Sequence, residues 1–380
     1  MSRVSELLAE LVAIPTHQAG PDGKGGNERR LCDHLAPLLR ERGADEVIVG
    51  DAKRTDGSPG AYVFARWGTP RRVINAHVDT VPANAGWSRD PWKPHIEGGK
   101  LYGLGSADTK GAIAATLVAL DAQRPTNAGV LFSGDEEAGS AVMHEFLKTP
   151  HATQIKEVIV CEPTARTAGI AHRGVIGQLA TVTGEGGHSS KADFMPKPIA
   201  KLARLAVRID DLGRQRLHTG PTGMRGICMN VAAIHGGVAF NVIPQRAVLE
   251  WSLRPYPGFD REAWDSSVAA AINDVDAEEW IARGLPSRPP EGERDQIALS
   301  TPIDHAPFAC DKLADAVRPF VKSVGSLDFW TEAALYQAHG IDAIVIGPGD
   351  IGTAHAADEF VPLDDLDWAV DLYRSLLASA

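Results

Sequence analysis

The sequence of 380 residues has few cysteines, few aromatic residues and no long uninterrupted apolar run. Its four cysteines (Cys32, Cys161, Cys228 and Cys310) lie far apart without a CxxC pair, which argues against a disulfide framework or a zinc knuckle. No stretch approaches the roughly 18 consecutive apolar residues of a membrane-spanning helix. A basic excess is also missing, because 38 basic and 49 acidic residues give a net charge of −11. Phosphate binding needs a basic face, so this balance argues against nucleic acid as the main partner.

The composition that is present is that of a soluble globular protein with material for a large core. Hydrophobic residues make up 44% of the chain and charged residues 23%. A prior of about 150 residues per domain gives two or three domains. The first residues place Glu6 and Glu10 in an amphipathic stripe, which predicts a surface helix and not an export signal. We therefore expect a cytoplasmic protein.

Hydrophobic periodicity predicts one α/β domain interrupted by a second domain. Residues 1–174 and 288–380 alternate helical and strand patterns, whereas residues 175–287 follow a strand–helix–strand–strand–helix order typical of a small open-faced α+β sandwich. In the outer parts the expected helices are 4–13, 28–42, 110–123, 307–324, 331–339 and 363–379, and the expected strands are 46–50, 61–67, 72–77, 129–133, 157–161 and 343–346. In the middle part the expected strands are 177–184, 226–235 and 246–254, and the expected helices are 195–212 and 260–283.

Metal-type ligands gather at the ends of the expected strands. His77 and Asp79 close one strand, and side chains two apart point the same way, so Asp79 can orient the His77 imidazole. Asp108 stands in a glycine-rich loop before a buried helix, where a helix N-cap is the alternative and a phosphate cradle a poorer one. Each motif alone is weak, since a structural histidine or a capping acid explains it equally well.

Three further acids and a histidine follow the same rule. Glu136 and Glu137 belong to an acidic run after a strand, Glu162 follows another strand, and His355 lies in a loop after the last strand. A solvated turn and a surface histidine are the plain alternatives. Because ligands of open α/β sheets bind beyond the carboxyl ends of the strands, the set together outweighs these separate readings. Two histidines and three carboxylates suit two zinc-like ions sharing one carboxylate, and a spare glutamate remains as a base.

Five segments in the same order resemble the dinuclear-zinc aminoacylase and carboxypeptidase superfamily. They are NAHVDTVP, GLGSADTKGA, SGDEEAGS, CEPT and GTAHAADEF. The similarity covers nearly the whole chain. Within the superfamily, the sequence most resembles the acetylornithine and N-acetylcitrulline deacetylases. That narrower likeness is carried by AAIHGG, FNVIPQRAVLEWSLRPYPG, FWTEA and GPGDIGTAHAADEF. The resemblance implies a zinc-peptidase-like catalytic domain with an inserted lid and dimerisation domain.

The resemblance also implies a role for each matching residue in the metal centre. Asp108 would bridge two divalent ions, most commonly zinc, with cobalt or manganese as alternatives. His77 and Glu162 would complete one metal site, and Glu137 and His355 the other.

The same resemblance places catalytic and substrate-binding residues. Glu136 would be the general base and Asp79 the orienting acid. In the inserted domain His188 would reach a neighbouring subunit's site and stabilise the oxyanion. Asn241 and Arg254 match lid positions that hold the substrate, where Arg254 suits an α-carboxylate; an ordinary turn asparagine and an exposed arginine are the alternatives.

The implied activity is hydrolysis of the N-acetyl amide of N-acetyl-L-ornithine in arginine biosynthesis by a homodimer. N-acetyl-L-citrulline is the alternative substrate, because the motifs do not show which residues form the pocket wall that selects between the ornithine and citrulline side chains. A succinyl-diaminopimelate desuccinylase or a dipeptidase would share the metal ligands and differ in the lid. A non-catalytic metal-binding interaction protein would be expected to lack a ligand or the base, and neither is missing.

Overall fold

The computed structural model describes residues 2–18, 25–282, 284 and 296–379, and it divides into two compact units. The first unit contains residues 1–171 and 309–380, and the second contains residues 172–308. The second unit runs further along the chain than the expected 175–287, because a strand at 297–305 belongs to its sheet. The expected boundary at 287 and 288, and the expected helix end at 283, lie outside the described residues.

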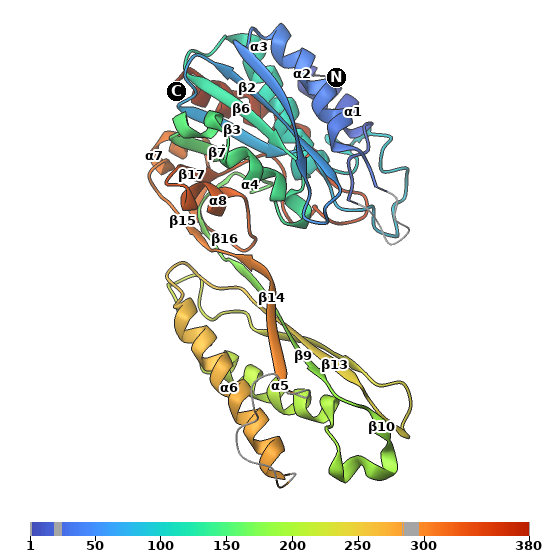
Figure 1. The fold of residues 1–380 in the computed structure, drawn as a ribbon. Helices are drawn as coiled ribbons and strands as arrows, with labels where there is room; N and C mark the ends of the chain where they lie inside the picture. The colour runs from blue at the N-terminus through green and yellow to red at the C-terminus, as the bar shows by residue number, and fades with distance from the viewer. Residues whose placement is uncertain (1, 19–24, 283, 285–295, 380) are drawn as a thin grey trace. The chain divides into compact units, whose positions relative to one another are not determined.

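A mixed sheet of nine strands forms the centre of the first unit, counted over the described residues (Figure 1). Its order is β1-β2-β6-β3-β7-β17-β8-β15, with β16 paired to β8. The strands are β1 (Glu46–Lys53), β2 (Pro59–Trp67), β3 (Arg72–His77), β6 (Ala128–Ser133), β7 (Glu157–Val160), β8 (Thr167–His172), β15 (Phe308–Ala309), β16 (Ser323–Leu327) and β17 (Asp342–Val345). The four neighbours β6, β3, β7 and β17 run parallel, so their carboxyl ends meet at one edge.

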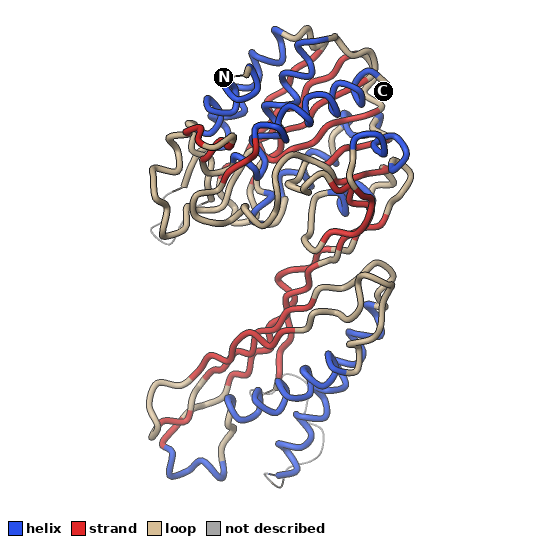
Figure 2. Tube along the Cα trace, turned by 180° about the vertical axis from the view of Figure 1, so that it is seen from behind, coloured by secondary structure: helices blue, strands red, loops and turns tan. Residues whose placement is uncertain are grey.

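Helices cover both faces of this sheet (Figure 2). One face carries α1 (Arg3–Val12), α2 (Glu28–Glu41), α3 (Gly111–Ala122) and α9 (Leu363–Ala378), whose apolar residues join one core cluster with β2, β3 and β6. The other face carries α4 (Ala141–Leu147) and α8 (Ala333–Ala338). Burial on both faces explains why the central strands are continuous apolar runs and do not alternate with polar residues.

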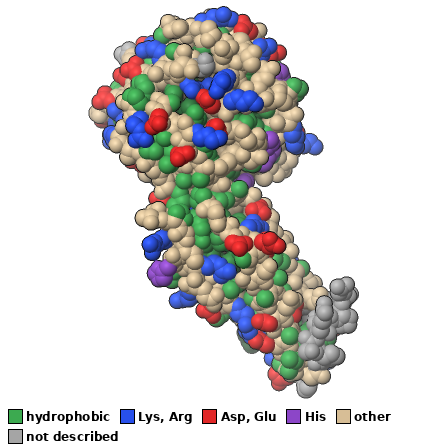
Figure 3. Space-filling view, turned by 90° about the vertical axis from the view of Figure 1, so that its left-hand side faces the viewer, with side chains coloured by type: hydrophobic (Ala, Val, Ile, Leu, Met, Phe, Trp, Pro, Cys, Tyr) green, Lys and Arg blue, Asp and Glu red, His purple; other side chains and the backbone are tan. Residues whose placement is uncertain are grey.

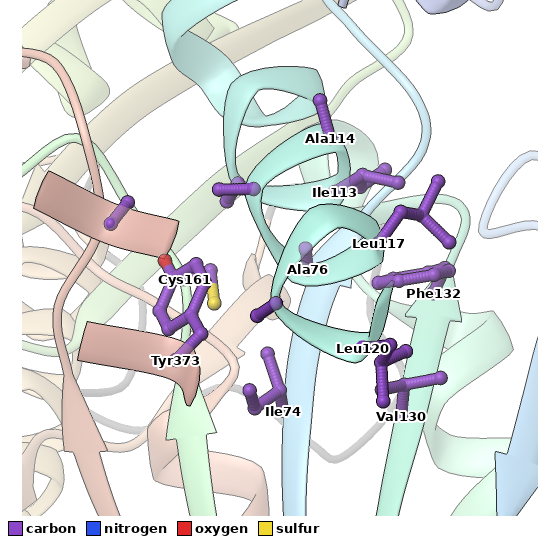
Figure 4. Packing of buried hydrophobic residues seen from close by; sticks show 14 of the residues in the cluster. Ile74, Ala76, Ile113, Ala114, Leu117, Leu120, Val130, Phe132, Cys161 and Tyr373 are labelled. Atoms are coloured by element: carbon purple, nitrogen blue, oxygen red, sulfur yellow. The ribbon is translucent and has the colours of Figure 1, made fainter. Parts of the chain in front are cut away.

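The helix α3 illustrates how this core is packed (Figure 4). It is rich in Ala and Leu and is buried around nearly its whole circumference, as the sequence predicts for residues 110–123. Leu117 and Leu120 lie against Phe132 and Val130 of β6. This packing fixes the start of α3, and with it the loop that carries Asp108, against the end of the sheet.

Over its described residues, the second unit is a four-stranded antiparallel sheet with two long helices on one face (Figures 1 and 2). Its order is β11-β13-β9-β14, and Leu205, Ile209, Trp264 and Val268 of the helices pack onto the sheet. The elements are β9 (Val175–Thr183), α5 (Pro198–Arg214), β11 (Asn230–Gly236), β13 (Arg246–Leu253), α6 (Arg261–Ala282) and β14 (Ile297–His305). The arrangement confirms the expected open-faced α+β sandwich.

Smaller elements complete the two units. A pair formed by β10 (Gly187–His188) and β12 (Val242–Ile243) belongs to the second unit. The first unit contains a three-stranded sheet of β4 (His95–Glu97), β5 (Lys100–Tyr102) and β18 (Phe360–Pro362), together with the short helix α7 (Ala314–Val317).

Basic and acidic side chains are interspersed on the face of the molecule drawn in Figure 3. Within the described ranges, none of the helices combines the length and the apolar character needed to cross a bilayer.

Candidate metal centre

The sequence-predicted ligands lie beyond the carboxyl ends of the parallel strands of the first unit. His77 is the last residue of β3, Glu136 and Glu137 follow β6, and Glu162 stands two residues after β7. His355 lies in the segment that follows β17. The parallel pairing of these strands therefore brings residues that are far apart in the sequence to one edge.

Asp108 lies between two imidazoles. His77 Nε2 is 2.8 Å from Asp108 Oδ1, and His355 Nε2 is 3.4 Å from Asp108 Oδ2. A carboxylate oxygen of Glu137 is 3.0 Å from the same His355 nitrogen. The donor atoms of His77, Asp108 and Glu137 all lie within 4.8 Å of one another, which is the spacing of a metal-ligand cluster. An aspartate that faces a histidine on each side has the geometry of a bridging ligand.

The loop of Asp108 is tied to the end of β3. Thr109 Oγ1 donates to the carbonyl oxygen of His77 at 2.9 Å, and the His77 amide is 3.1 Å from Thr109 Oγ1. Gly105 has φ +78°, a left-handed conformation that glycine adopts without strain. A Cβ at this position would lie 2.6 Å from Thr80 Cγ2, so the loop requires glycine here.

Asp79 contacts both His77 and the turn of residues 135–139, which carries Glu136 and Glu137 and is called the acidic turn below. His77 Nδ1 lies 2.9 Å from the backbone oxygen of Asp79 and 3.6 Å from its Oδ1. The Asp79 carboxylate accepts the backbone N–H groups of Glu136 and Glu137, each at 3.2 Å. Asp79 is fully buried, so these bonds hold the turn against the strand end in a water-excluded place.

Asp135 fixes the same turn from its other side. Its φ of +68° is unusual for a residue other than glycine. The Asp135 carboxylate accepts the Thr55 amide at 2.8 Å, the Thr55 hydroxyl at 2.7 Å and the Ala141 amide at 2.9 Å. The turn that carries Glu136 and Glu137 is thus held by two buried carboxylates.

The electrostatics of the cluster call for positive charge. Burial, together with the charge of neighbouring acids, raises the pKa values of Glu136, Glu137 and Glu162. Burial opposes protonation of His77, yet hydrogen bonds to Asp108 and Asp79 raise its pKa well above the ordinary value. Hydrogen bonds to Asp108 and Glu137 raise the pKa of His355 to about 10.

These shifts test whether the residues fit a metal. Crowded buried carboxylates are costly without a compensating charge, and here the imidazoles supply it only by holding protons. Imidazole nitrogens and carboxylate oxygens are also the ligands that zinc and its neighbours prefer. The donor set therefore fits divalent cations.

The structure brings two of the three predicted residues of the second unit together. His188 in β10 pairs with Val242 in β12, and Val242 is the residue that follows Asn241 in the chain. The Asn241 backbone oxygen accepts a hydrogen bond from the Ser189 amide at 3.1 Å. Both side chains are exposed and line a cavity of about 570 Å³. His188 Nδ1 is 2.9 Å from Ser190 Oγ.

Arg254 does not join them. It follows β13 at the end opposite Arg246, and Arg246 lines the same cavity as His188. The strand between them spans roughly 25 Å at the usual rise per residue. Arg254 is exposed, and its backbone is fixed by a bond to Ile227 and by Arg173 Nη1.

Comparison with known proteins gives this arrangement a family. A family model described as peptidase family M20/M25/M40 matches residues 73–379. The chain belongs to this family. It is therefore a metal-dependent amidohydrolase, and the resemblance seen in the motifs is confirmed.

Among the curated relatives of this M20 chain are deacetylases of two kinds. The N-acetyl-L-citrulline deacetylase of Xanthomonas campestris is 34% identical over 375 residues, covering 98% of this chain and 96% of the relative. The acetylornithine deacetylase of Pasteurella multocida is 28% identical over 98% of this chain and 96% of the relative. A succinyl-diaminopimelate desuccinylase of Stenotrophomonas maltophilia is also 28% identical, covering 99% of both.

Solved structures show the same fold. An M20 family metallo-carboxypeptidase from Sulfolobus solfataricus has a TM-score of 0.75 at 16% identity and covers 99% of each chain. A Bacillus subtilis protein described as a dinuclear metal binding peptidase of the M20 family has a TM-score of 0.64 at 15% identity, over 99% of this chain and 96% of that one.

Sequence reasoning missed several residues that shape the M20 centre. Thr55 and Asp135 fix the acidic turn, and Glu359 binds the loop of Asp108. No spacing in the sequence marks Thr55, Asp135 or Glu359 for these roles, because each bonds to a group distant in the chain. Glu332 was not missed, since it belongs to the FWTEA segment of the narrower resemblance. It is buried after β16 and accepts the Ser133 hydroxyl at 3.0 Å, and burial raises its pKa to about 7.

Proposed function

We propose that this M20 chain hydrolyses the N-acetyl amide of N-acetyl-L-ornithine to acetate and L-ornithine. The observation that carries the proposal is the cluster of His77, Asp108, Glu137 and His355 at one sheet edge, beside the spare buried acid Glu136. N-acetyl-L-citrulline is the second candidate substrate, favoured by the 34% identity to a deacetylase named for it. We place the reaction in arginine biosynthesis in the cytoplasm.

The proposed metal sites use the donors already described. His77 and Glu162 would hold one divalent ion, and Glu137 and His355 the other, with Asp108 between the two. Zinc is the proposed metal, with cobalt or manganese compatible with the same ligands. Two such ions would supply Lewis acidity toward the amide carbonyl and the attacking water.

Glu136 is the proposed general base. Burial and the charge of Glu162 raise its pKa, so the carboxylate readily takes up a proton from the attacking water. The same side chain then delivers that proton to the leaving α-amine. Asp79 holds the Glu136 backbone amide, which keeps the carboxylate in place during both transfers.

The second unit supplies the proposed lid and dimer contacts. His188 would donate a hydrogen bond to the developing oxyanion, an interaction worth about 3–4 kcal/mol in such sites. Within the second unit, His188 and Asn241 lie at one end of the sheet and Arg254 at the other. We propose a homodimer in which His188 serves the partner's centre, with Asn241 and Arg254 holding the substrate and Arg254 binding its α-carboxylate.

Initial rates on N-acetyl-L-ornithine and N-acetyl-L-citrulline, measured side by side, test the proposal. The enzyme is loaded with zinc or cobalt, and a chelated sample is the control. A chelator-sensitive preference for ornithine supports the first candidate, and one for citrulline supports the second. If neither amide is cleaved while N-succinyl-diaminopimelate or a dipeptide is, the substrate proposal is wrong.

A further inference from the structure

Glu359 is a buried acid to which neither the motif analysis nor the proposed mechanism gives a role. It is 2% exposed and stands directly before β18. Its carboxylate accepts three backbone N–H groups of one loop: Gly105 at 3.0 Å, Ala107 at 2.9 Å and Asp108 at 3.1 Å. Its own backbone oxygen accepts the Gly103 amide at 3.0 Å.

The glycine-rich loop is therefore an anion cradle that is filled by the chain's own carboxylate. The left-handed Gly105 turns successive amides inward, and converging amides of this kind bind anions. Hydrogen bonds from amides to an ionised carboxylate are about twice as strong as neutral ones. Lys110, which is also buried, interacts electrostatically with Glu359 while its Nζ donates to the Ile14 oxygen at 2.9 Å.

This cradle determines where the Asp108 side chain lies. The Asp108 amide is bound by Glu359, and the next residue, Thr109, is bound to the His77 backbone through its hydroxyl. With the backbone held on both sides, the carboxylate is directed between His77 and His355. Loss of one of these ties would let the whole turn move.

The segment of Glu359 also carries His355. His355 and Asp358 have φ values of +57° and +58°, conformations that cost energy in residues other than glycine. Asp358 Oδ1 accepts the Ser88 amide at 2.9 Å and its hydroxyl at 3.0 Å, and Asn84 Nδ2 donates to the His355 backbone oxygen. The segment is thus held at its first, fourth and fifth residues.

We propose that Glu359 is a positioning residue that couples the two candidate metal ligands Asp108 and His355. Its carboxylate fixes the Asp108 loop, and its backbone fixes the segment of His355 relative to that loop. The inference rests on the proposed function only in taking these two residues as metal ligands. Partners that orient ligands in this way typically change metal affinity by about 10- to 100-fold when altered.

Cobalt titration of the full chain tests this role without substrate. Glu359→Gln keeps the size of the side chain but turns an amide NH₂ toward one of three donors. Glu359→Asp keeps the charge and withdraws it from the loop. Glu157→Gln is the matched control. Glu157 at the start of β7 pairs with Arg72 at the start of β3, at the edge of the sheet away from the candidate ligands.

We expect Glu359→Gln to bind the second equivalent of Co²⁺ at least about tenfold more weakly, with a changed visible absorption spectrum. Glu359→Asp should be intermediate, and Glu157→Gln should match the wild-type titration even if its melting temperature falls. Wild-type affinity and spectrum in both Glu359 variants would overturn the inference. A wild-type chain that binds no cobalt would overturn the proposed function as well, so the two failures are distinguishable.

Discussion

At the scale of single residues, Glu136 and Glu137 are adjacent in the chain and differ in their contacts. Glu137 faces His355 at 3.0 Å, whereas Glu136 is surrounded by the charges of Glu162, His77 and Glu137. Both backbone amides are bound to Asp79, so each substitution acts through its own side chain.

We expect Glu136→Gln to lower kcat by about 10²–10⁴-fold while two cobalt ions still bind, because only the proton carrier is removed. Glu137→Gln should instead lose cobalt affinity, because a proposed ligand is removed. Steady-state kinetics and cobalt titration of both variants check this. If the two variants lost cobalt equally, the assignment of Glu136 as a base and not a ligand would be wrong.

Glu28, at the start of α2, predicts a pH dependence of stability. Burial, followed by the charge of Asp79, raises its pKa from 4.5 to about 8. Between these values the folded chain holds a proton that the unfolded chain releases, so its contribution to stability falls as the pH rises. A shift of this size corresponds to at most roughly 5 kcal/mol.

Glu28→Gln cannot ionise, so its stability relative to the wild type should increase from about pH 5 to about pH 8. Urea unfolding of both chelated proteins across this range measures the difference. Parallel loss of stability in the two proteins would contradict the assignment. Arg54 Nε lies 3.4 Å from Glu28 Oε1. Its attraction to Glu28 grows only as Glu28 ionises, so loss of this contact in the variant would give a slope of the opposite sign.

His77, Glu137 and Glu162 could be predicted from the sequence because they end or closely follow apolar strands whose carboxyl ends meet at one edge. Asp108 and His355 lie in loops, and the motif resemblance was needed to assign their roles as ligands. The hydrogen-bond partners of the Asp79 carboxylate could not be predicted in this way. Period-two spacing places Asp79 beside His77, and the distance of 3.6 Å agrees with that. The bonds of its carboxylate to Glu136 and Glu137 depend on a turn whose shape is set by Asp135 and the distant Thr55.

At the scale of elements, prolines explain two errors in the secondary structure predicted from hydrophobic periodicity. The expected helix at 307–324 was wrong, since the segment forms β15, the short α7 and the start of β16. Pro319 has no N–H and restricts the residue before it, and α7 ends at Val317.

β14 was not predicted at all. Pro302 interrupts its apolar pattern, and the pairing with β9 shifts register between Ser300 and Ile303. A proline is tolerated because β14 is an edge strand. The pairing itself joins parts of the chain about 120 residues apart in sequence, which no local pattern reports.

A substitution in the turn between β1 and β2 should affect the acidic turn, which is distant in the sequence. Thr55→Val removes the hydroxyl bond to Asp135 and keeps the backbone bond, so we expect a loss of about 1 kcal/mol in unfolding free energy. We also expect a lower kcat with little change in KM, because the proposed base Glu136 moves and the proposed substrate-binding residues do not. Ser58→Ala is the matched control, since the Ser58 hydroxyl that it removes donates to exposed Asp56 in the same turn. Equal kinetics in the two variants would contradict the link.

At the scale of the whole molecule, the proposed dimer predicts complementation between two inactive chains. His188→Ala leaves a complete metal centre, and Glu136→Gln leaves a complete His188. If His188 serves the partner's centre, a mixed dimer has one working site, and co-expression should restore roughly a quarter of wild-type activity when chains pair at random. Activity no higher than that of the separate variants would show that His188 acts within its own chain.

The place of β17 in the sheet has a consequence for biosynthesis. β17 lies between β7 and β8, although these two strands are neighbours in the sequence and β17 is made some 170 residues later. A nascent chain on the ribosome therefore has a gap in this nine-stranded sheet until the residues of β17 have been made. His355 and Glu359 emerge later still, so the proposed metal centre is complete only after residue 359 has been made.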